Sequence, residues 1–144
     1  PADLENDALR TQAVADAASR VAVIPEVRTA LVAFQRDFAR RDGGAVLDGR
    51  DIGSVICPDA AVKLFVTASP KIRAERRYLE LVARGVTAQR DAILNEVLAR
   101  DARDQDRATA PLVAAPDATL IDTSDLTAAQ AVRQAIAVVD TRRP

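Results

Sequence analysis

A short loop between two glycines is the strongest candidate for a chemical site in this sequence. The segment 49–53, Gly-Arg-Asp-Ile-Gly, directly follows an apolar run at 45–48. Glycines let the backbone turn and approach a ligand closely. The guanidinium of Arg50 could hold a phosphate, and the carboxylate of Asp51 could accept hydrogen bonds from an amino group or a ring N–H. The alternative interpretation is an ordinary turn at a strand end with a surface ion pair.

A second candidate set lies near residue 100. Arg100, Asp104 and Arg107 follow one another at i, i+4 and i+7, so a helix would place them on one face. That face continues the apolar stripe of Ile93 and Val97, which predicts that it turns inward. An arginine placed before its acid is the less favourable order for a helical ion pair. This favours a set that faces a ligand, and the alternative is a solvated run of charges.

A third candidate set consists of Arg73, Arg76 and Arg77, near the start of a predicted helix. Clustered guanidinium groups of this kind could clamp phosphates and neutralise the charge that develops in phosphoryl transfer. The alternative is an exposed amphipathic helix. Asp48 and Asp122, at strand ends, are either structural or close to a metal, and spacing does not decide between these. Metal ligands are not predicted at any residue.

The composition of the 144 residues excludes several kinds of site. The sequence has no His, and its single Cys, Cys57, is most simply a small buried hydrophobe. Serine–histidine triads, histidine metal ligands, internal disulfides and multi-cysteine zinc sites are therefore excluded. The absence of Met predicts a processed chain or a fragment. Most of the 18 arginines fit a general compositional bias toward Ala, Arg, Val and Asp.

Charge and hydropathy favour an ordinary cytoplasmic protein. The net charge of −1 argues against general binding to nucleic acid, which requires a basic surface. No apolar run is long enough to span a membrane, and the sequence does not open on a basic segment followed by an apolar one.

The candidate residues are distributed over alternating predicted helices and strands. A proline or a capping residue marks the start of several helices, as in Ser69-Pro70, Thr87 and the capping box from Thr127 to Gln130. Short apolar runs alternating with helices indicate an α/β fold with a parallel sheet. Three strands make a thin sheet, so we expect it to be incomplete. The predicted helices are 4–23, 25–40, 70–82, 87–104 and 127–139, and the predicted strands are 45–48, 62–67 and 119–122.

Taken in order, these motifs resemble the bacterial cytidylate kinase family, whose members are P-loop nucleoside monophosphate kinases. The segments that carry the resemblance extend over nearly the whole chain. They include Ala-Ala-Ser-Arg at 17–20, Pro-Glu-Val-Arg at 25–28, Asp-Gly-Arg-Asp-Ile-Gly at 48–53, Arg-Ala-Glu-Arg-Arg at 73–77, Arg-Asp-Ala-Arg-Asp at 100–104 and Leu-Ile-Asp-Thr-Ser at 120–124. The resemblance implies that residues 1–144 are the C-terminal part of a single α/β kinase domain. Within it, residues 70–107 resemble a helical lid.

The resemblance also implies substrates and residue roles. The implied substrates are ATP and CMP or dCMP, with Mg²⁺. Ser19, Arg28 and Asp51 would contact the cytosine ring, Arg50 and Arg107 the α-phosphate of CMP, and Arg100 and Asp104 the sugar. Arg73, Arg76 and Arg77 would contact the phosphates of ATP. Arg76, Arg77 and Arg107 would be the catalytic groups.

The sequence departs from the family in one large respect. The motif Gly-x-x-x-x-Gly-Lys-Ser/Thr occurs nowhere in the 144 residues, so the P-loop lysine, the hydroxyl ligand of Mg²⁺ and the first strand are missing. A smaller departure is Asp16, where the family commonly has Asn. We expect the chain alone to be inactive. One alternative is a non-catalytic fragment that binds CMP or associates through exposed sheet edges. The other is a kinase for another nucleoside monophosphate, such as AMP or UMP.

Overall fold

The computed structural model describes residue 9 and residues 11–22, 24–105 and 113–142. The chain divides into two compact units, Pro1–Leu47 and Asp48–Pro144. Each unit is described by itself.

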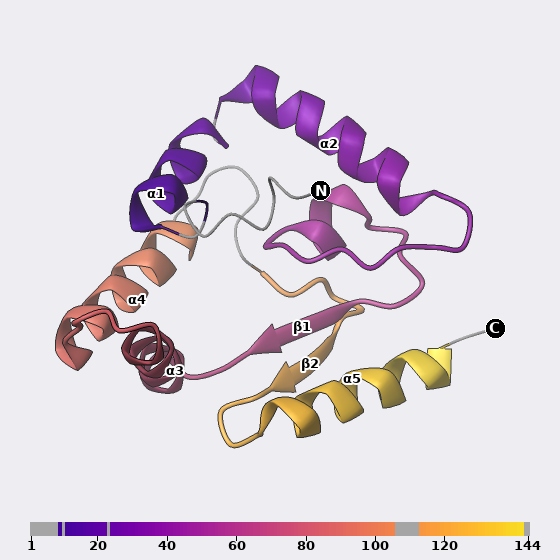
Figure 1. The fold of residues 1–144 in the computed structure, drawn as a ribbon. Helices are drawn as coiled ribbons and strands as arrows, with labels where there is room; N and C mark the ends of the chain where they lie inside the picture. The colour runs from indigo at the N-terminus through magenta and orange to yellow at the C-terminus, as the bar shows by residue number, and fades with distance from the viewer. Residues whose placement is uncertain (1–8, 10, 23, 106–112, 143–144) are drawn as a thin grey trace. The chain divides into compact units, whose positions relative to one another are not determined.

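The described residues of the first unit form helices α1 and α2 (Figure 1). Helix α1 spans Gln12–Val21 and helix α2 spans Pro25–Ala39, with proline in its first turn as predicted. The helix predicted from residue 4 begins later in the described part, because the Thr11 hydroxyl accepts a hydrogen bond from the Val14 N–H at 3.4 Å and caps it there. After α2, Gly43 and Gly44 have φ angles of 84° and 77°, which glycine adopts at little cost.

The predicted strand at 45–48 is wrong. These residues adopt no regular secondary structure, and the side chain of Val46 is 95% exposed. A strand requires backbone hydrogen bonds to a neighbouring strand, and the described residues include no strand paired with this segment. The apolar composition of 45–48 satisfied the sequence pattern without supplying that neighbour.

The sheet of the second unit has two parallel strands in the described residues. Strand β1 spans Leu64–Thr67 and strand β2 spans Thr119–Asp122, with Leu64 opposite Thr119 and Thr67 opposite Asp122. The predicted strands at 62–67 and 119–122 are thus confirmed, the first shortened by two residues. A side-chain contact joins the segments that directly precede the two strands. Lys63 Nζ donates to both carboxylate oxygens of Asp117, at 3.0 and 2.7 Å, and also to the Pro58 carbonyl.

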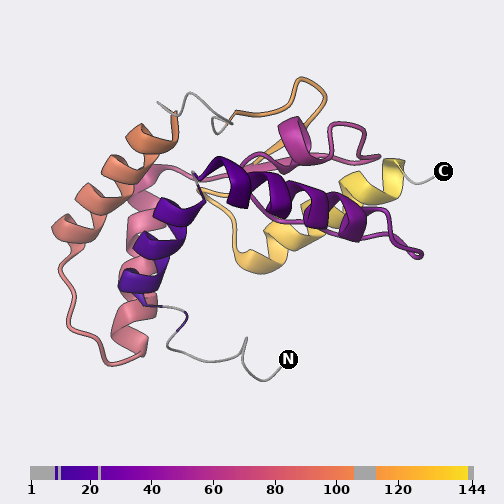
Figure 2. The ribbon, with the colours of Figure 1, turned by 90° about the horizontal axis from the view of Figure 1, so that it is seen from above.

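Helices α3 and α4 form a helical hairpin after β1 (Figure 2). Helix α3 spans Pro70–Ala83, and the Ser69 hydroxyl caps it by accepting from the Ile72 N–H at 3.4 Å, as predicted. Gly85, with a φ of 73°, follows its end. Helix α4 spans Arg90–Gln105, so the predicted cap at Thr87 is wrong. The Gln89 carbonyl accepts the first helical hydrogen bond, from the Ile93 N–H at 3.1 Å, and residues 86–89 adopt no regular secondary structure.

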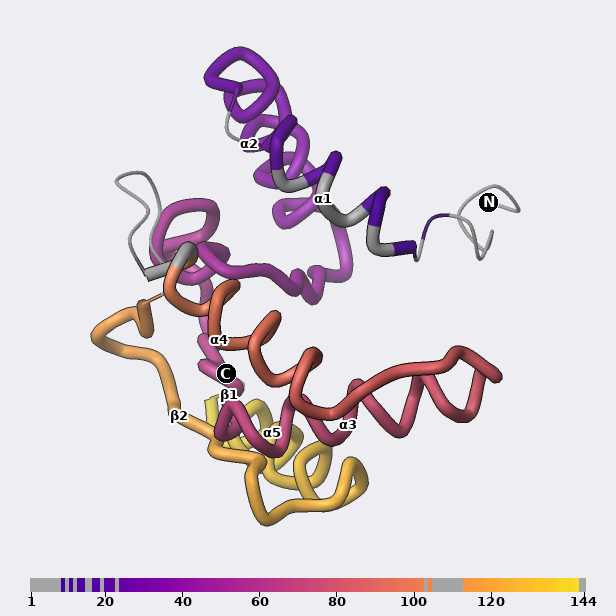
Figure 3. Tube along the Cα trace, turned by 90° about the vertical axis from the view of Figure 1, so that its left-hand side faces the viewer, coloured from indigo at the N-terminus to yellow at the C-terminus, as the bar shows by residue number. Residues whose placement is uncertain are grey.

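Helix α5, Ala128–Arg142, packs against β2 (Figures 1 and 3). Its predicted capping box is confirmed. The Thr127 N–H donates to Gln130 Oε1 at 2.8 Å, and the Gln130 N–H donates to Thr127 Oγ1 at 3.3 Å. The helix continues beyond its predicted end at residue 139.

The buried apolar side chains of the second unit are mostly small. They are Ile56, Cys57, Ala68, Ala74, Ile93, Ala115 and Ile121. The burial of Cys57 confirms its interpretation as a small hydrophobe. In the part of the chain that the structure describes, no helix combines the length and apolar character that crossing a membrane requires.

Candidate functional site

The loop at 49–53 leads into a tight turn of π-helix, η3, at Ile52–Ile56. The Asp51 carbonyl accepts hydrogen bonds from the N–H groups of Val55 and Ile56, at 2.8 and 3.2 Å, and this fixes the backbone directly after Arg50. A Cβ at Gly49 would lie 2.8 Å from Cγ1 of Ile52, so glycine is needed for this close approach. The loop is therefore a hydrogen-bonded turn, and Gly49 allows its backbone to pack closely against Ile52.

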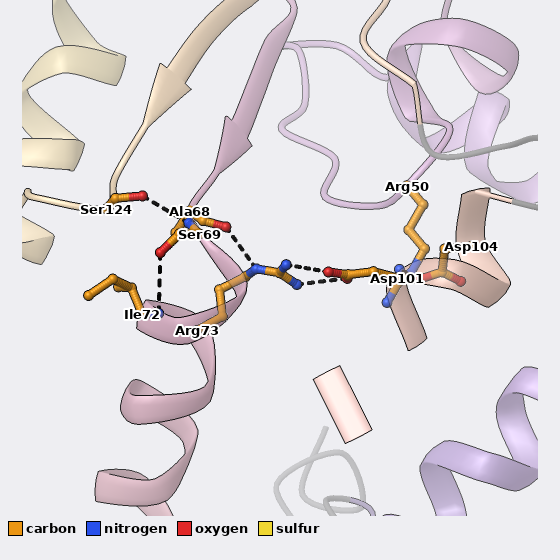
Figure 4. Close-up of polar contacts among 8 residues, drawn as sticks. All are labelled: Arg50, Ala68, Ser69, Ile72, Arg73, Asp101, Asp104 and Ser124. Carbon is orange, nitrogen blue, oxygen red and sulfur yellow. Dashed lines mark hydrogen bonds and ion pairs between the residues drawn. The ribbon is translucent and has the colours of Figure 1, made fainter. Parts of the chain in front are cut away.

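Arg50 reaches from this loop to helix α4 (Figure 4). Its Nη1 forms an ion pair with Oδ2 of Asp104. Asp104 is only 2% exposed, whereas the Arg50 side chain is 32% exposed. A buried carboxylate that has no partner destabilises the folded protein. Removing one partner of a buried ion pair lowers the free energy of unfolding by on the order of 3–5 kcal/mol. Two residues predicted from separate motifs thus meet, with the acid inside and the guanidinium at the surface.

Arg73 is held beside this pair by a residue that the sequence motifs did not single out. Its Nη1 and Nη2 donate to the two carboxylate oxygens of Asp101, at 2.8 and 2.5 Å. Its Nε donates to the Ala68 carbonyl at 2.9 Å. The hydrogen bonds from Arg73 hold the pKa of Asp101 below its ordinary value against the opposing effect of burial. The charges of Arg50 and Arg100 lower it further.

We define the arginine–aspartate cluster as Arg50, Arg73, Asp101 and Asp104. Its arginines come from the loop before η3 and from α3, and both acids come from α4, where they are three residues apart and share a helix face. The spacing of the two acids was the available sequence signal for Asp101. Its partner on α3, however, is distant in the sequence and is identified only by the structure.

The other arginines predicted to contact ATP have different partners. Arg76 donates to Oγ1 and the carbonyl of Thr123, at 3.0 and 2.5 Å, and to the Leu126 carbonyl at 3.2 Å. It thereby joins α3 to the segment after β2. Arg77 pairs with Glu80 of the same helix at 3.0 Å. The structure therefore gives Arg73, Arg76 and Arg77 three separate sets of contacts.

The face predicted to turn inward on α4 divides. Asp104 and Ile93 are buried, but Arg100 is exposed, so the prediction is wrong for Arg100. A guanidinium beyond the last apolar position keeps its hydration by pointing outward. Arg107, the third member of that set, lies outside the described residues.

The remaining predicted residues are Asp51 in the second unit and Ser19 and Arg28 in the first. Asp51 is half-buried beside Arg50. Ser19 belongs to α1, and Arg28 is a half-buried residue of α2; both are described within the first unit only.

Asp122 has a structural environment at the end of β2. It accepts hydrogen bonds from the backbone N–H and the hydroxyl of Ser124, at 2.9 and 2.6 Å, and these bonds lower its pKa. Ser124 Oγ in turn accepts from the Ser69 N–H at 2.8 Å. Over the described ranges, no group of three or more carboxylate, thiol or imidazole side chains is placed to hold a metal ion.

Comparison with known proteins gives a consistent result. A family model described as cytidylate kinase matches residues 2–141. A protein named cytidylate kinase from Cereibacter sphaeroides is 60% identical over 142 residues, which are 99% of this chain and 69% of that relative. Similar proteins of the same name come from Azorhizobium caulinodans, at 58% identity over 97% of this chain and 68% of the relative, and from a Bradyrhizobium strain, at 56% over 99% and 68%.

Proposed function

The chain belongs to the cytidylate kinase family, and from this premise we propose that its residues take part in the transfer of the γ-phosphate of ATP to CMP or dCMP. The products are ADP and CDP or dCDP, and the reaction takes place in the cytoplasm. An oxygen of the nucleoside monophosphate attacks the γ-phosphorus in line, while the bond from that phosphorus to the β-phosphate oxygen breaks. No covalent intermediate with the protein is needed, because positioning and charge neutralisation lower the barrier.

The observation that carries this proposal is the ion pair between Arg50 and Asp104. It joins the loop at 49–53 to α4 and places the partly exposed side chain of Arg50 beside a buried carboxylate. A guanidinium fixed in this way can offer its remaining N–H groups to a phosphate. Arg50, together with Arg107, is assigned to the α-phosphate of CMP, and Asp104 and Arg100 are assigned to the sugar.

The base is assigned to Asp51, Arg28 and Ser19. Cytosine offers an amino donor and ring acceptors, which a carboxylate and a guanidinium–hydroxyl pair complement. A site built from polar groups that would otherwise stay unpaired discriminates strongly against a base without the matching partners. This assignment distinguishes a cytidylate kinase from a kinase for AMP or UMP.

The assignment of Asp51 is tested by calorimetric titration of the protein with CMP and with AMP. Asp51→Ala is expected to weaken CMP binding about tenfold or more, because it removes a polar partner of the base. Asp59→Ala removes the same charge at an exposed position close in the sequence and serves as the control. An equal loss of CMP and AMP binding in Asp51→Ala would contradict the assignment to the base.

The ATP side of the proposal assigns Arg73, Arg76 and Arg77 to phosphate groups, with Arg76, Arg77 and Arg107 as the catalytic groups. The described residues do not gather a metal-binding cluster. The Mg²⁺ of the proposed reaction is therefore not assigned to them, and no step passes through it. Because the 144 residues contain no P-loop motif, we expect a polypeptide of these residues alone to show no CMP phosphorylation in a coupled assay. Measurable turnover would show that the motif is dispensable.

A second candidate function is CMP binding without catalysis, combined with self-association. It is favoured by the two-stranded sheet, in which each strand has one paired neighbour among the described residues. Exposed strands are templates for pairing with another chain. Light scattering distinguishes the candidates, since a CMP-binding monomer contradicts association through the sheet.

A further inference from the structure

We propose that Asp101 is a positioning residue that occupies, on the guanidinium of Arg73, the place that a phosphate group of ATP takes when nucleotide binds. The carboxylate holds Arg73 in a defined orientation and is displaced by phosphate. The inference rests on the assignment of Arg73 to ATP in the proposed function. Asp101 itself has no role in that assignment.

The first step of the argument is the occupancy of the guanidinium. Two edges of this group can make paired hydrogen bonds, the Nη1–Nη2 edge and the edge that contains Nε. The first is filled by both oxygens of Asp101, and Nε donates to the Ala68 carbonyl. A phosphate that binds Arg73 through two parallel hydrogen bonds must therefore replace a group already present.

The second step is the choice of the group that leaves. The Ala68 carbonyl is a backbone group of a buried residue directly after β1, so it cannot move away by a change of side-chain rotamer. The Asp101 carboxylate is a side chain, and the exposed fractions are 37% for the Arg73 side chain and 26% for that of Asp101. Carboxylate and phosphate present the same paired acceptors to arginine, and phosphate carries the greater charge. Exchange of Asp101 for phosphate thus preserves the geometry of Arg73.

The third step is the environment of the displaced carboxylate. Asp101 lies three residues from Asp104 on α4, and the charges of Arg50 and Arg100 both lower its pKa. After displacement, these two arginines continue to stabilise the ionised carboxylate. Arg50, which is assigned to the phosphate of CMP, therefore also favours the release of Arg73 from Asp101. Arg73 is the arginine assigned to ATP.

The proposal is tested by calorimetric titration of the full chain with inorganic tripolyphosphate, which carries the phosphate chain without a base. Asp101→Asn keeps the size of the side chain but removes the competing charge, so we expect tripolyphosphate to bind about fivefold more tightly. A residue that only stabilises the hairpin would give unchanged or weaker binding when replaced. The gain should vanish when Asp101→Asn is combined with Arg73→Ala.

The matched control is Glu75→Gln. Glu75 forms the other paired contact between α3 and α4, with Arg90, so this substitution removes the same charge from the same hairpin. It should leave the affinity for tripolyphosphate unchanged. An equal gain in Glu75→Gln, no gain in Asp101→Asn, or no measurable binding to either protein would overturn the proposal.

A measurement on the unsubstituted chain keeps the test independent of folding in the variants. The carboxyl carbon resonance of Asp101, followed by NMR as a function of pH, should report a higher pKa when tripolyphosphate is present, because the hydrogen bonds from Arg73 are lost. An unchanged titration at saturating tripolyphosphate would overturn displacement. Titration with CMP in the same preparation separates the two proposals. Failure of CMP to bind contradicts the proposed function, whereas intact CMP binding with no effect of Asp101→Asn contradicts only this inference.

Discussion

The contacts Arg73–Asp101 and Arg90–Glu75 both join α3 to α4, and their surroundings differ. Near the end of α4, Arg73 holds both oxygens of Asp101 at 2.8 and 2.5 Å. At the start of α4, Arg90 holds both oxygens of Glu75 at 2.9 and 3.1 Å. Both contacts are paired hydrogen bonds, but Arg73 donates from Nη1 and Nη2, whereas Arg90 donates from Nε and Nη2. Helix α3 supplies the arginine in the first contact and the acid in the second.

The difference lies in exposure and in the neighbouring charges. The Glu75 and Arg90 side chains are 41% and 58% exposed, and Arg90 lies over the Tyr78 ring, 3.9 Å from its centroid. The more covered contact of Arg73 adjoins a second pair, whose acid is buried. A paired geometry alone therefore does not define a site. The inner contact, Arg73–Asp101, differs from the exposed outer contact, Arg90–Glu75, because several arginines surround its acid and the neighbouring Asp104.

The largest expected effect comes from removing the partner of the buried acid beside the Arg73–Asp101 contact. Arg50→Ala withdraws the ion-pair partner of Asp104, a carboxylate that is 2% exposed. We expect the free energy of unfolding to fall by about 3 kcal/mol, the lower end of the range for a broken buried pair. Urea denaturation measures this change. A loss as small as that of an exposed arginine, for which Arg84→Ala is the control, would show that burial does not set the inner contact apart.

An intermediate effect is expected from the inner contact itself, through its dependence on pH. The folded pKa of Asp101 lies below its ordinary value of 3.8, mainly because of hydrogen bonds from Arg73. The stabilisation is therefore present above that ordinary value and is lost as pH falls through the depressed pKa. Asp101→Asn should lower stability at neutral pH by about 1 kcal/mol, since the contact is partly screened by solvent. The difference between the two proteins should shrink as the pH of the denaturation experiment falls below 3.8.

The smallest effect is expected at the outer contact. Glu75→Gln removes a solvent-exposed ion pair, and such pairs are weakened by salt and by the entropy of two long side chains. Thermal unfolding at low salt should show only a slight decrease in Tm, and the decrease should disappear in about 0.5 M salt. A Glu75→Gln variant that loses as much stability as Asp101→Asn would remove the distinction between the two contacts.

Features that depend on nearby residues were predicted well from the sequence. The start of α3 at Ser69-Pro70, the capping box before α5 and the limits of β2 all follow from local hydrogen bonding and apolar composition. The predicted strand at 45–48 failed because a strand also needs a partner, which composition does not reveal. The Thr87 cap failed for the related reason that a capping residue acts only where a helix begins.

The candidate site was also predictable only in part, because its contacts depend on partners that are distant in the sequence. Arg50 and Asp104 were found as members of motifs, but their ion pair joins segments distant in the sequence. Asp101 was missed because only its spacing from Asp104 distinguishes it from the surrounding charges. Arg73, the partner of Asp101 on α3, was identified as a site residue, but it was predicted to contact a phosphate and not a carboxylate. Long-range pairing between side chains is thus the information that the sequence motifs lacked.

The parallel pairing of β1 with β2 has a consequence for the order of folding. The contact of Lys63 with Asp117, beside the start of the pair, joins residues separated by 54 positions in the chain. During synthesis from the N-terminus, the α3–α4 hairpin is complete before any residue of β2 has been added. Local contacts form quickly, and closure of a long loop carries an entropic cost. We therefore expect the Arg73–Asp101 contact to form before β1 pairs with β2, whereas the Arg50–Asp104 ion pair spans as many positions as the Lys63–Asp117 contact and carries a similar cost of loop closure.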